Sequence, residues 1–161
     1  MISLNIRAYR GLSTYRLDVI WGKNAVGVKW DTGAAKTVIS IGAISDVITP
    51  EKLAKLIELC ETRCGRLKKR FESASGDPFY GYPVCVSNVI FGGEMLSKFC
   101  YYLVLENKRD IALLGYDFID RCTYSHISGG DIIVTAFNEV GYGEIDGAMR
   151  SDEVSDFIGS L

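Results

Sequence analysis

The stretch that decides the fold is residues 28–40, Val28-Lys29-Trp30-Asp31-Thr32-Gly33-Ala34-Ala35-Lys36-Thr37-Val38-Ile39-Ser40. An apolar strand runs into Asp-Thr-Gly, the chain turns, and a second run of β-branched residues follows. Asp31 would stand at the end of a rigid strand, Thr32 can brace the turn with its hydroxyl, and Gly33 lets the backbone approach closely. Asp-x-Gly alone is also ordinary turn chemistry, so the rest of the chain must decide between a turn and a site.

A second segment, residues 111–119, reads Ile-Ala-Leu-Leu-Gly-Tyr-Asp-Phe-Ile. In this order, the two segments resemble the retropepsin-like aspartic peptidases, whose strand, Asp-Thr-Gly-Ala and nearby Thr are followed downstream by two apolar residues, a glycine and a short helix. The residues that match this pattern are Thr32, Gly33, Ala34, Thr37, Leu113, Leu114 and Gly115. The resemblance covers roughly residues 15 to 138. It implies that Asp31 is catalytic and that Leu113-Leu114-Gly115 packs behind its loop, so that Thr32, Gly33, Ala34, Leu114 and Gly115 form the scaffold.

Residues 71–82, between these two segments, resemble the flap of this family, a hairpin that closes over the substrate. Gly76 and Gly81 would supply mobility, and Tyr80 or Tyr82 would press on a bound peptide. A plain surface hairpin has the same local pattern. The resemblance implies Gly76, Tyr80 and Tyr82 as substrate contacts, and Val89 to Gly93 resembles the next hairpin of the family.

Three positions depart from the pattern of the retroviral members. Those enzymes pair an acid two residues after the motif glycine with an arginine after the later glycine, and here the positions hold Ala35 and Tyr116. Both partners are replaced together, which favours a cellular or bacterial type. Lys29 replaces an apolar residue and, by strand alternation, lies on the same face as Asp31. Its ammonium either extends to water or biases a substrate-binding subsite toward acidic or polar side chains and favours ionised carboxylates.

The chain as a whole predicts a mainly β fold, a closed retropepsin-like barrel subunit with one inserted helix and a short C-terminal helix. The predicted strands are residues 17–21, 25–30, 37–41, 79–89, 99–105 and 132–137, with turns at residues 22–24 and at Gly92-Gly93. The inserted helix is predicted from about residue 50 to 69, since Thr49-Pro50-Glu51 is a helix start and an apolar stripe follows at helical spacing. Gly65 would weaken this helix, and residues 118–122 predict a further short helix.

Two parts are predicted, a retropepsin-like domain over residues 1–138 and an acidic tail over residues 139–161. Val154, Phe157, Ile158 and Leu161 lie at helical spacing, and Ser151 or Asp152 could cap the helix. The tail is therefore either a frayed polar end or a short helix that docks on the body or on a partner.

Composition bounds the remaining functions. The net charge of −2 gives no reason to expect a nucleic-acid partner, and no apolar run is long enough to span a membrane.

Five scattered cysteines and no leader favour a reducing, cytoplasmic setting without disulfides. Cys60 and Cys64 lie on the stripe of the inserted helix, which favours core packing over a metal site. We expect His126 to be structural or exposed, although a Cys-His peptidase stays a distant alternative, and we expect neither a metal nor an organic cofactor.

The chain contains a single Asp-Thr-Gly. Peptide hydrolysis in the aspartic class needs two carboxylates that share one proton, one to activate a water and one to polarise the scissile carbonyl. The sequence therefore predicts an aspartic endopeptidase that is a homodimer, with one Asp31 from each subunit and a peptide or protein as substrate. The alternative is a retropepsin-like module that binds peptides or dimerises without catalysis, because fold alone does not establish turnover.

Overall fold

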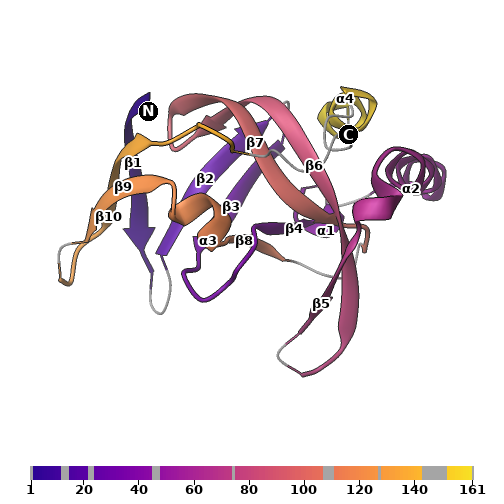
Figure 1. The fold of residues 1–161 in the computed structure, drawn as a ribbon, viewed down its shortest axis with the longest axis horizontal. Helices are drawn as coiled ribbons and strands as arrows, with labels where there is room; N and C mark the ends of the chain where they lie inside the picture. Colours follow the sequence, from indigo (N-terminus) through magenta and orange to yellow (C-terminus); the bar gives the residue numbers. More distant parts are fainter. Residues whose placement is uncertain are drawn as a thin grey trace.

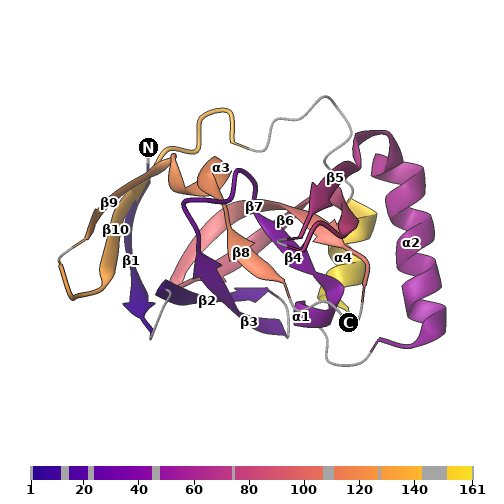
Figure 2. The ribbon, with the colours of Figure 1, turned by 90° about the horizontal axis from the view of Figure 1, so that it is seen from below.

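The structure is a computed structural model that describes residues 2–11, 15–21, 24–44, 48–73, 75–106, 111–126, 128–142 and 152–160. It is mainly β (Figures 1 and 2). The strands are β1 (Ile2–Arg10), β2 (Tyr15–Trp21), β3 (Asn24–Trp30), β4 (Val38–Ser40), β5 (Lys69–Glu72), β6 (Pro78–Phe91), β7 (Glu94–Val104), β8 (Ala112–Leu114), β9 (Cys122–His126) and β10 (Ile132–Phe137). The helices are α1 (Ile41–Ile44), α2 (Pro50–Cys64), the 3₁₀ turn η1 (Gly65–Leu67), α3 (Tyr116–Ile119) and α4 (Asp152–Gly159).

The strands close into the predicted barrel. Strand β6 pairs with β7, and the ring continues through β4, β8, β3 and β2. Strand β2 returns to β6 through the pairs Val19 with Phe91 and Ile20 with Ile90, which closes the ring. Closure leaves no exposed edge within the ring. Outside the ring, β1 continues from β2, and β10 and β9 follow it in order, so that β9 lies at one end of the strand order.

Two apolar clusters lie on opposite sides of the central strands. The larger core includes Trp30, Ile39, Leu103 and Leu114, together with a stack of aromatic rings around Phe118. The second cluster is built from Val38, Phe79 and Val104, which are buried, with Phe71, Tyr102, Ile111 and Leu113 packed against them. Successive residues of one strand therefore belong to different clusters, because the side chains of a strand point alternately to its two faces.

Helix α2 begins where the sequence predicts. The Thr49 hydroxyl accepts a hydrogen bond from the Lys52 backbone N–H at 3.2 Å, and Pro50 is the first helical residue. The α-helix ends at Cys64, however, and not near residue 69. Residues 65–67 tighten into η1, and Lys69 already belongs to β5. We expected residues 66–70, which are rich in Lys and Arg, to form the last turn of the helix. Instead, these residues lead into β5 and its hairpin.

Helix α4 confirms the short C-terminal helix. It lies against α2 and β6 (Figure 2), and Val154 and Ile158 are almost fully buried. Arg63 of α2 forms an ion pair with Glu153 of α4. The residue before the undescribed stretch, Tyr142, is also buried and its hydroxyl accepts a hydrogen bond from the Cys100 N–H at 2.9 Å. Both described parts of the predicted tail thus pack on the body. The division at residue 138 stays a prediction, and Ser151 and Leu161 lie outside the described residues.

The cysteines correct one expectation. Cys85 of β6 and Cys100 of β7 face each other in the strand register and form a disulfide, whereas the odd, scattered count favoured reduced thiols. Scattered cysteines carry no information on strand register, so the sequence alone did not bring this pair together. Cys60 and Cys64 are free and buried in the core, as predicted, and burial raises the pKa of the Cys122 thiol to about 12.

Most predicted strands are present, with shifted ends. Residue 41 begins α1, Cys122 begins β9 after the short helix α3, and β6 and β7 meet at the predicted Gly92-Gly93 turn. Residues 22 and 23 of the other predicted turn lie outside the described residues. Strands β1 and β9 were not predicted. Within the described residues, no helix is both long and apolar enough to cross a membrane.

Candidate active site

Asp31 lies where β3 ends, at the mouth of a tight turn. Its backbone N–H donates to the Leu114 carbonyl at 3.0 Å, and its own carbonyl accepts from the Ala34 N–H at 3.2 Å. The Gly33 N–H donates to Asp31 Oδ1 at 3.0 Å. One carboxylate oxygen is therefore oriented by the turn, and Oδ2 is turned toward other partners. Thr32 and Gly33 are exposed in the single chain, so the motif presents a face on which a second molecule could pack.

The segment after β8 supports this turn from behind. The Tyr116 N–H donates to the Ala34 carbonyl at 2.7 Å, and the Asp117 N–H donates to the Ala35 carbonyl at 3.3 Å. A Cβ at Gly115 would come within 2.3 Å of the Lys36 carbonyl carbon, so only glycine allows this approach. Backbone contacts thus connect the two loops at the positions where retroviral members use an acid and an arginine.

Thr37 and Asp117 join the two loops through side chains. The Thr37 hydroxyl donates to Asp117 Oδ1 at 2.7 Å and accepts from the Gly115 N–H at 3.1 Å. The same Asp117 oxygen accepts from the Phe118 N–H at 2.9 Å, at the start of α3. Asp117 was not among the predicted site residues, because nothing in the sequence around it resembles the Asp31 motif. Its place in the first turn of a short helix was the available signal. It positions the loop and does not face the open oxygen of Asp31.

Removing the Thr37 hydroxyl should destabilise this junction. Thr37 is fully buried, so Thr37→Val leaves the Gly115 N–H and the Asp117 carboxylate short of a partner. We expect the free energy of unfolding to fall by about 2–3 kcal/mol, measured by denaturant unfolding. Thr37→Ser keeps both hydrogen bonds and should cost about 1 kcal/mol for one lost methyl. A Val variant that is as stable as the Ser variant would contradict this role.

Lys29 contacts the other oxygen of Asp31. Its Nζ lies 3.7 Å from Asp31 Oδ2, and the two side chains are 41% and 26% exposed. The ammonium thus lies on the Asp31 face, as alternation predicted, and it turns toward the carboxylate. A half-exposed ion pair of this kind contributes about 0–1 kcal/mol. It can therefore be displaced by a competing charge at small cost.

The second apolar cluster lies on the same face as Lys29 and Asp31. Leu113 is the register partner of Lys29, Val38 is the partner of Leu113, and Tyr102 is the partner of Val38. Residues that are paired in adjacent strands point to the same side of a sheet. An apolar surface therefore extends from Lys29 across three strands. Burial and, second, the charge of Asp117 raise the pKa of the Tyr102 phenol.

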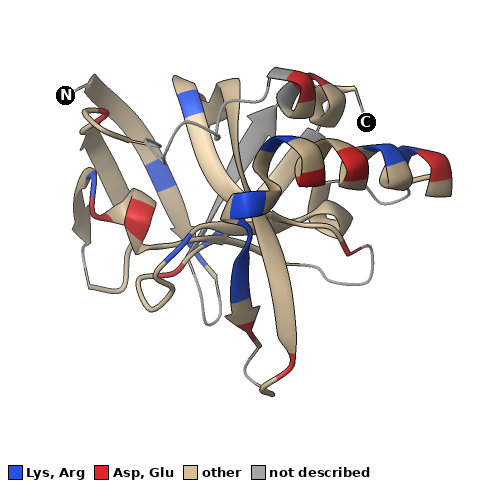
Figure 3. Ribbon diagram, turned by 45° about the vertical axis from the view of Figure 1, so that its right-hand side comes forward, with Lys and Arg blue, Asp and Glu red and all other residues tan. Residues whose placement is uncertain are grey.

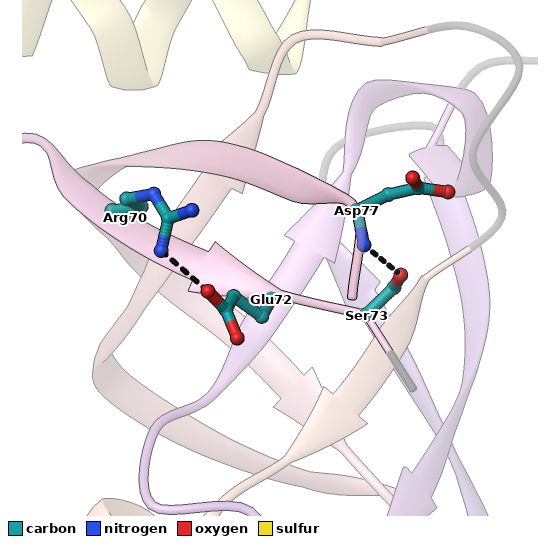
Figure 4. A network of polar contacts seen from close by, with 4 residues as sticks. All are labelled: Arg70, Glu72, Ser73 and Asp77. Atoms are coloured by element: carbon teal, nitrogen blue, oxygen red, sulfur yellow. Dashed lines mark hydrogen bonds and ion pairs between the residues drawn. The ribbon is translucent and has the colours of Figure 1, made fainter. Parts of the chain in front are cut away.

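The predicted flap is a hairpin of β5 and the first half of β6, and it projects from the body (Figure 3). Its tip is closed by hydrogen bonds that involve Ser73, Gly76 and Asp77, including Asp77 N–H to Ser73 Oγ at 3.1 Å (Figure 4). Gly76 has φ of +88°, a conformation that favours glycine. Arg70 and Glu72 form an ion pair at 2.7 Å along β5 (Figure 4). Gly76 therefore shapes the turn at the tip.

Phe71 and Phe79 are the aromatic residues of this hairpin that belong to the second apolar cluster. Their rings stack at 5.5 Å, and Phe71 packs edge-on against Tyr102. Gly81 makes room for this packing, because a Cβ there would meet Tyr102 at 2.8 Å. Gly81 thus allows close packing against Tyr102, whereas the sequence suggested that it supplies mobility.

The two predicted flap tyrosines point the other way. Tyr80 and Tyr82 alternate with Phe79 and Gly81, so they lie on the opposite face of β6. Tyr82 is only 8% exposed and its hydroxyl donates to Glu61 of α2, and burial raises the pKa of its phenol. Tyr80 is exposed, with Lys68 Nζ 5.4 Å above its ring. Tyr80 and Tyr82 thus lie on the face of β6 away from the second apolar cluster, and their role as substrate contacts stays a prediction.

The described residues add no support for the other candidate sites, a histidine-based site and a metal site. His126 is exposed at the end of β9. No group of three or more His, Cys, Asp or Glu side chains suited to a metal ion occurs in the described part of the chain. Asp31 is thus the residue around which described loops, charges and an apolar surface converge.

Comparison with known proteins gives a match at the level of structure. No family model and no curated protein matches the sequence. A retropepsin-like aspartic protease from Rickettsia conorii is similar in structure, with a TM-score of 0.52 and 16% identity over 81% of this chain and 98% of that one. The retroviral protease-like domain of Ddi1 from Leishmania major also matches, with a TM-score of 0.44 and 14% identity over 81% of this chain and 95% of that one. On the match to the Rickettsia protease, together with the closed barrel, the chain has a retropepsin-like fold.

Proposed function

We propose that the protein is an aspartic endopeptidase that works as a homodimer, with Asp31 of each subunit forming the catalytic pair. The observation that carries this proposal is the geometry of Asp31. Its Oδ1 accepts a hydrogen bond from the Gly33 N–H, its Oδ2 lies 3.7 Å from Lys29 Nζ, and the turn that holds it packs closely against Gly115. A rigid turn that presents one carboxylate is half of the arrangement that two-carboxylate peptide hydrolysis requires.

The proposed reaction uses the two carboxylates in different protonation states. One ionised Asp31 takes a proton from a water, whose oxygen attacks the scissile carbonyl carbon, while the protonated Asp31 donates its proton to the carbonyl oxygen. The tetrahedral intermediate then collapses and the C–N bond breaks. The leaving nitrogen accepts a proton from the carboxyl group that deprotonated the water, and the other carboxylate takes a proton back from one of the two hydroxyls, which restores the pair with its one shared proton. Two carboxylates that share one proton favour a mildly acidic pH. No metal or organic cofactor takes part in this proposal.

Two features support a second copy as the partner. Thr32 and Gly33, the rest of the motif, are exposed beside Asp31. Strand β9 pairs only with β10 among the described strands, and its Tyr124 packs edge-on against Trp30 at 5.2 Å. An available strand edge therefore lies next to the residue that precedes Asp31. Because a two-fold interface applies the same surface twice, antiparallel pairing of two β9 edges would bring two such motifs together.

The substrate surface we propose is the apolar cluster on the Asp31 face, covered by the β5–β6 hairpin. Leu113, Tyr102 and Ile111, the partly buried residues of this cluster, would supply apolar contacts over the buried Val38 and Phe79. Lys29 borders them, and Gly76 would contribute through the closed tip of the hairpin. The cluster suits apolar side chains of an extended peptide, whose residues alternate with the same period as the strands.

The alternative is a peptide-binding or dimerisation module without turnover, and one observation favours it. Lys29 occupies the oxygen of Asp31 that a catalytic water would use. One experiment separates the two functions. Wild type and Asp31→Asn are incubated with a diverse peptide library from pH 4 to 8, and products are identified by mass spectrometry. Cleavage by wild type alone is expected, while peptide binding by both proteins without cleavage would favour the module and overturn the peptidase.

A cytoplasmic location is also part of the proposal, and the disulfide offers its test. Reducing compartments keep cysteines as thiols, so alkylation of the acid-trapped, denatured protein from cells should modify Cys85 and Cys100 if the protein resides there. Protection of this pair from alkylation would place the protein in an oxidising compartment instead.

A further inference from the structure

We infer that Lys29 determines substrate specificity by recognising an acidic side chain next to the scissile bond, and that this recognition releases Asp31. The inference rests on the proposed peptidase function. In the free chain, Lys29 Nζ and Asp31 Oδ2 are 3.7 Å apart. A substrate carboxylate at the neighbouring position would compete for the same ammonium and leave Oδ2 open for water.

The position of Lys29 limits which part of a substrate it can reach. Lys29 and Asp31 are two residues apart on one strand and point to the same side of the sheet. A peptide bond held at Asp31 therefore places an adjoining side chain, and not a distant one, within reach of Nζ. In a two-fold dimer, each half of the site would contribute one Lys29, so that the residue on either side of the cleaved bond meets an ammonium.

The surrounding charges favour an acidic partner. The strand register runs from Lys29 through Leu113, Val38 and Tyr102, which carry no acid. At the far end of this apolar surface, Lys69 Nζ lies 5.9 Å above the ring of Phe71, and Figure 3 shows this basic start of β5 on the hairpin. The apolar surface thus has a described basic residue at each end, Lys29 and Lys69.

Asp117 and Lys36 are the other charged residues of the two loops that hold Asp31. Asp117 accepts hydrogen bonds from Thr37 and from the Phe118 N–H. Lys36, in the loop after the motif, lies half-buried with its backbone against Gly115. Among the described side chains, Lys29 is the cation within ion-pair distance of the Asp31 carboxylate. Within the part of the chain that the structure describes, Asp31 is likewise the anion within ion-pair distance of Lys29, so a substrate carboxylate would compete with Asp31 for this ammonium.

Paired substrates test the inference. A peptide that wild type cleaves is made with Glu or Gln at the residue next to the scissile bond, and kcat/KM is measured for each. We expect wild type to prefer Glu by about fivefold at pH 6, the size of a partly exposed charge pair. Lys29→Met should reduce the ratio to about one, and Lys29→Arg should retain it, because arginine keeps the charge. The preference should fade below about pH 4.3, where the glutamate of the peptide becomes neutral.

The matched control is Lys98→Met, which makes the same change of charge on β7, where Lys98 Nζ lies 6.0 Å from the Tyr142 ring. It should leave the Glu preference as in wild type. Equal rates for both peptides in wild type, or a Glu preference that survives Lys29→Met, would overturn the inference while leaving the peptidase intact. A complete lack of cleavage at every pH overturns the proposed function and this inference together. Thermal unfolding of each variant checks that all are folded.

Discussion

Gly115→Ala is expected to destabilise the fold strongly. An added Cβ would lie 2.3 Å from the carbonyl carbon of Lys36, 2.4 Å from its oxygen and 2.8 Å from its Cα. These are backbone atoms, and they cannot retreat without breaking the hydrogen bonds that join the two loops, such as Tyr116 N–H to the Ala34 carbonyl. Overpacking against a fixed backbone costs about 3 kcal/mol or more. Since single domains have a net stability of only about 5–15 kcal/mol, denaturant unfolding should show a large shift to lower concentration.

The chain offers a matched control in Gly159, at the end of α4. A Cβ there meets nothing within 4 Å, and alanine is the better helix former. Gly159→Ala should therefore unfold at the same denaturant concentration as wild type or at a slightly higher one. If Gly115→Ala behaved like Gly159→Ala, the close approach of the two loops would be wrong, and with it the account of how Asp31 is held.

Asp31→Asn is expected to reduce kcat/KM by about a thousandfold or more, because the amide can neither accept the proton of the attacking water nor share one with its partner. The fold should persist, since an amide oxygen can still accept from the Gly33 N–H. If each chain contributes one Asp31 to a shared pair, mixtures of wild-type and Asp31→Asn chains give a further prediction. If both carboxylates are needed and subunits assort at random, an equal mixture of the two chains should retain about one quarter of the wild-type activity.

The mixture is made by unfolding and refolding wild type and Asp31→Asn together, at constant total concentration and several ratios. Activity should fall with the square of the wild-type fraction. A linear fall, with half the activity at equal amounts, would mean that each chain carries a complete site and would contradict the shared pair. Asp156→Asn, an exposed acid on α4, serves as the control and should leave activity unchanged at every ratio.

The sequence was most informative where residue type and local geometry are tied together. Thr49-Pro50 marked the start of α2 because a capping hydroxyl and a proline each fit one position of a helix. Gly92-Gly93 marked the β6–β7 turn because positive φ favours glycine, and both residues have it. The order of the Asp31 and Gly115 segments along the chain indicated that they belong together, and the structure places them in contact.

The remaining features depend on long-range register, which a single sequence does not specify. Strands β1 and β9 have mixed polarity, since each is partly exposed, and they exist because β10 pairs with both. The Cys85–Cys100 disulfide and the Thr37–Asp117 hydrogen bond join residues on different elements. The faces of Tyr80 and Tyr82 followed from where Gly81 packs, which only the neighbouring strand reveals.

Strand β6 is 14 residues long and takes part in three different structures. Its last residues close the barrel against β2, Cys85 in its middle is tied to β7, and its first residues form the hairpin over the Asp31 face. Tyr82 is anchored to Glu61 of α2 at the point where the hairpin leaves the body. The hairpin is therefore held at one end, and we expect it to bend in the residues before Tyr82. If the proposed peptidase function holds, a substrate would enter by displacing the tip and would leave the barrel and the Asp31 turn in place.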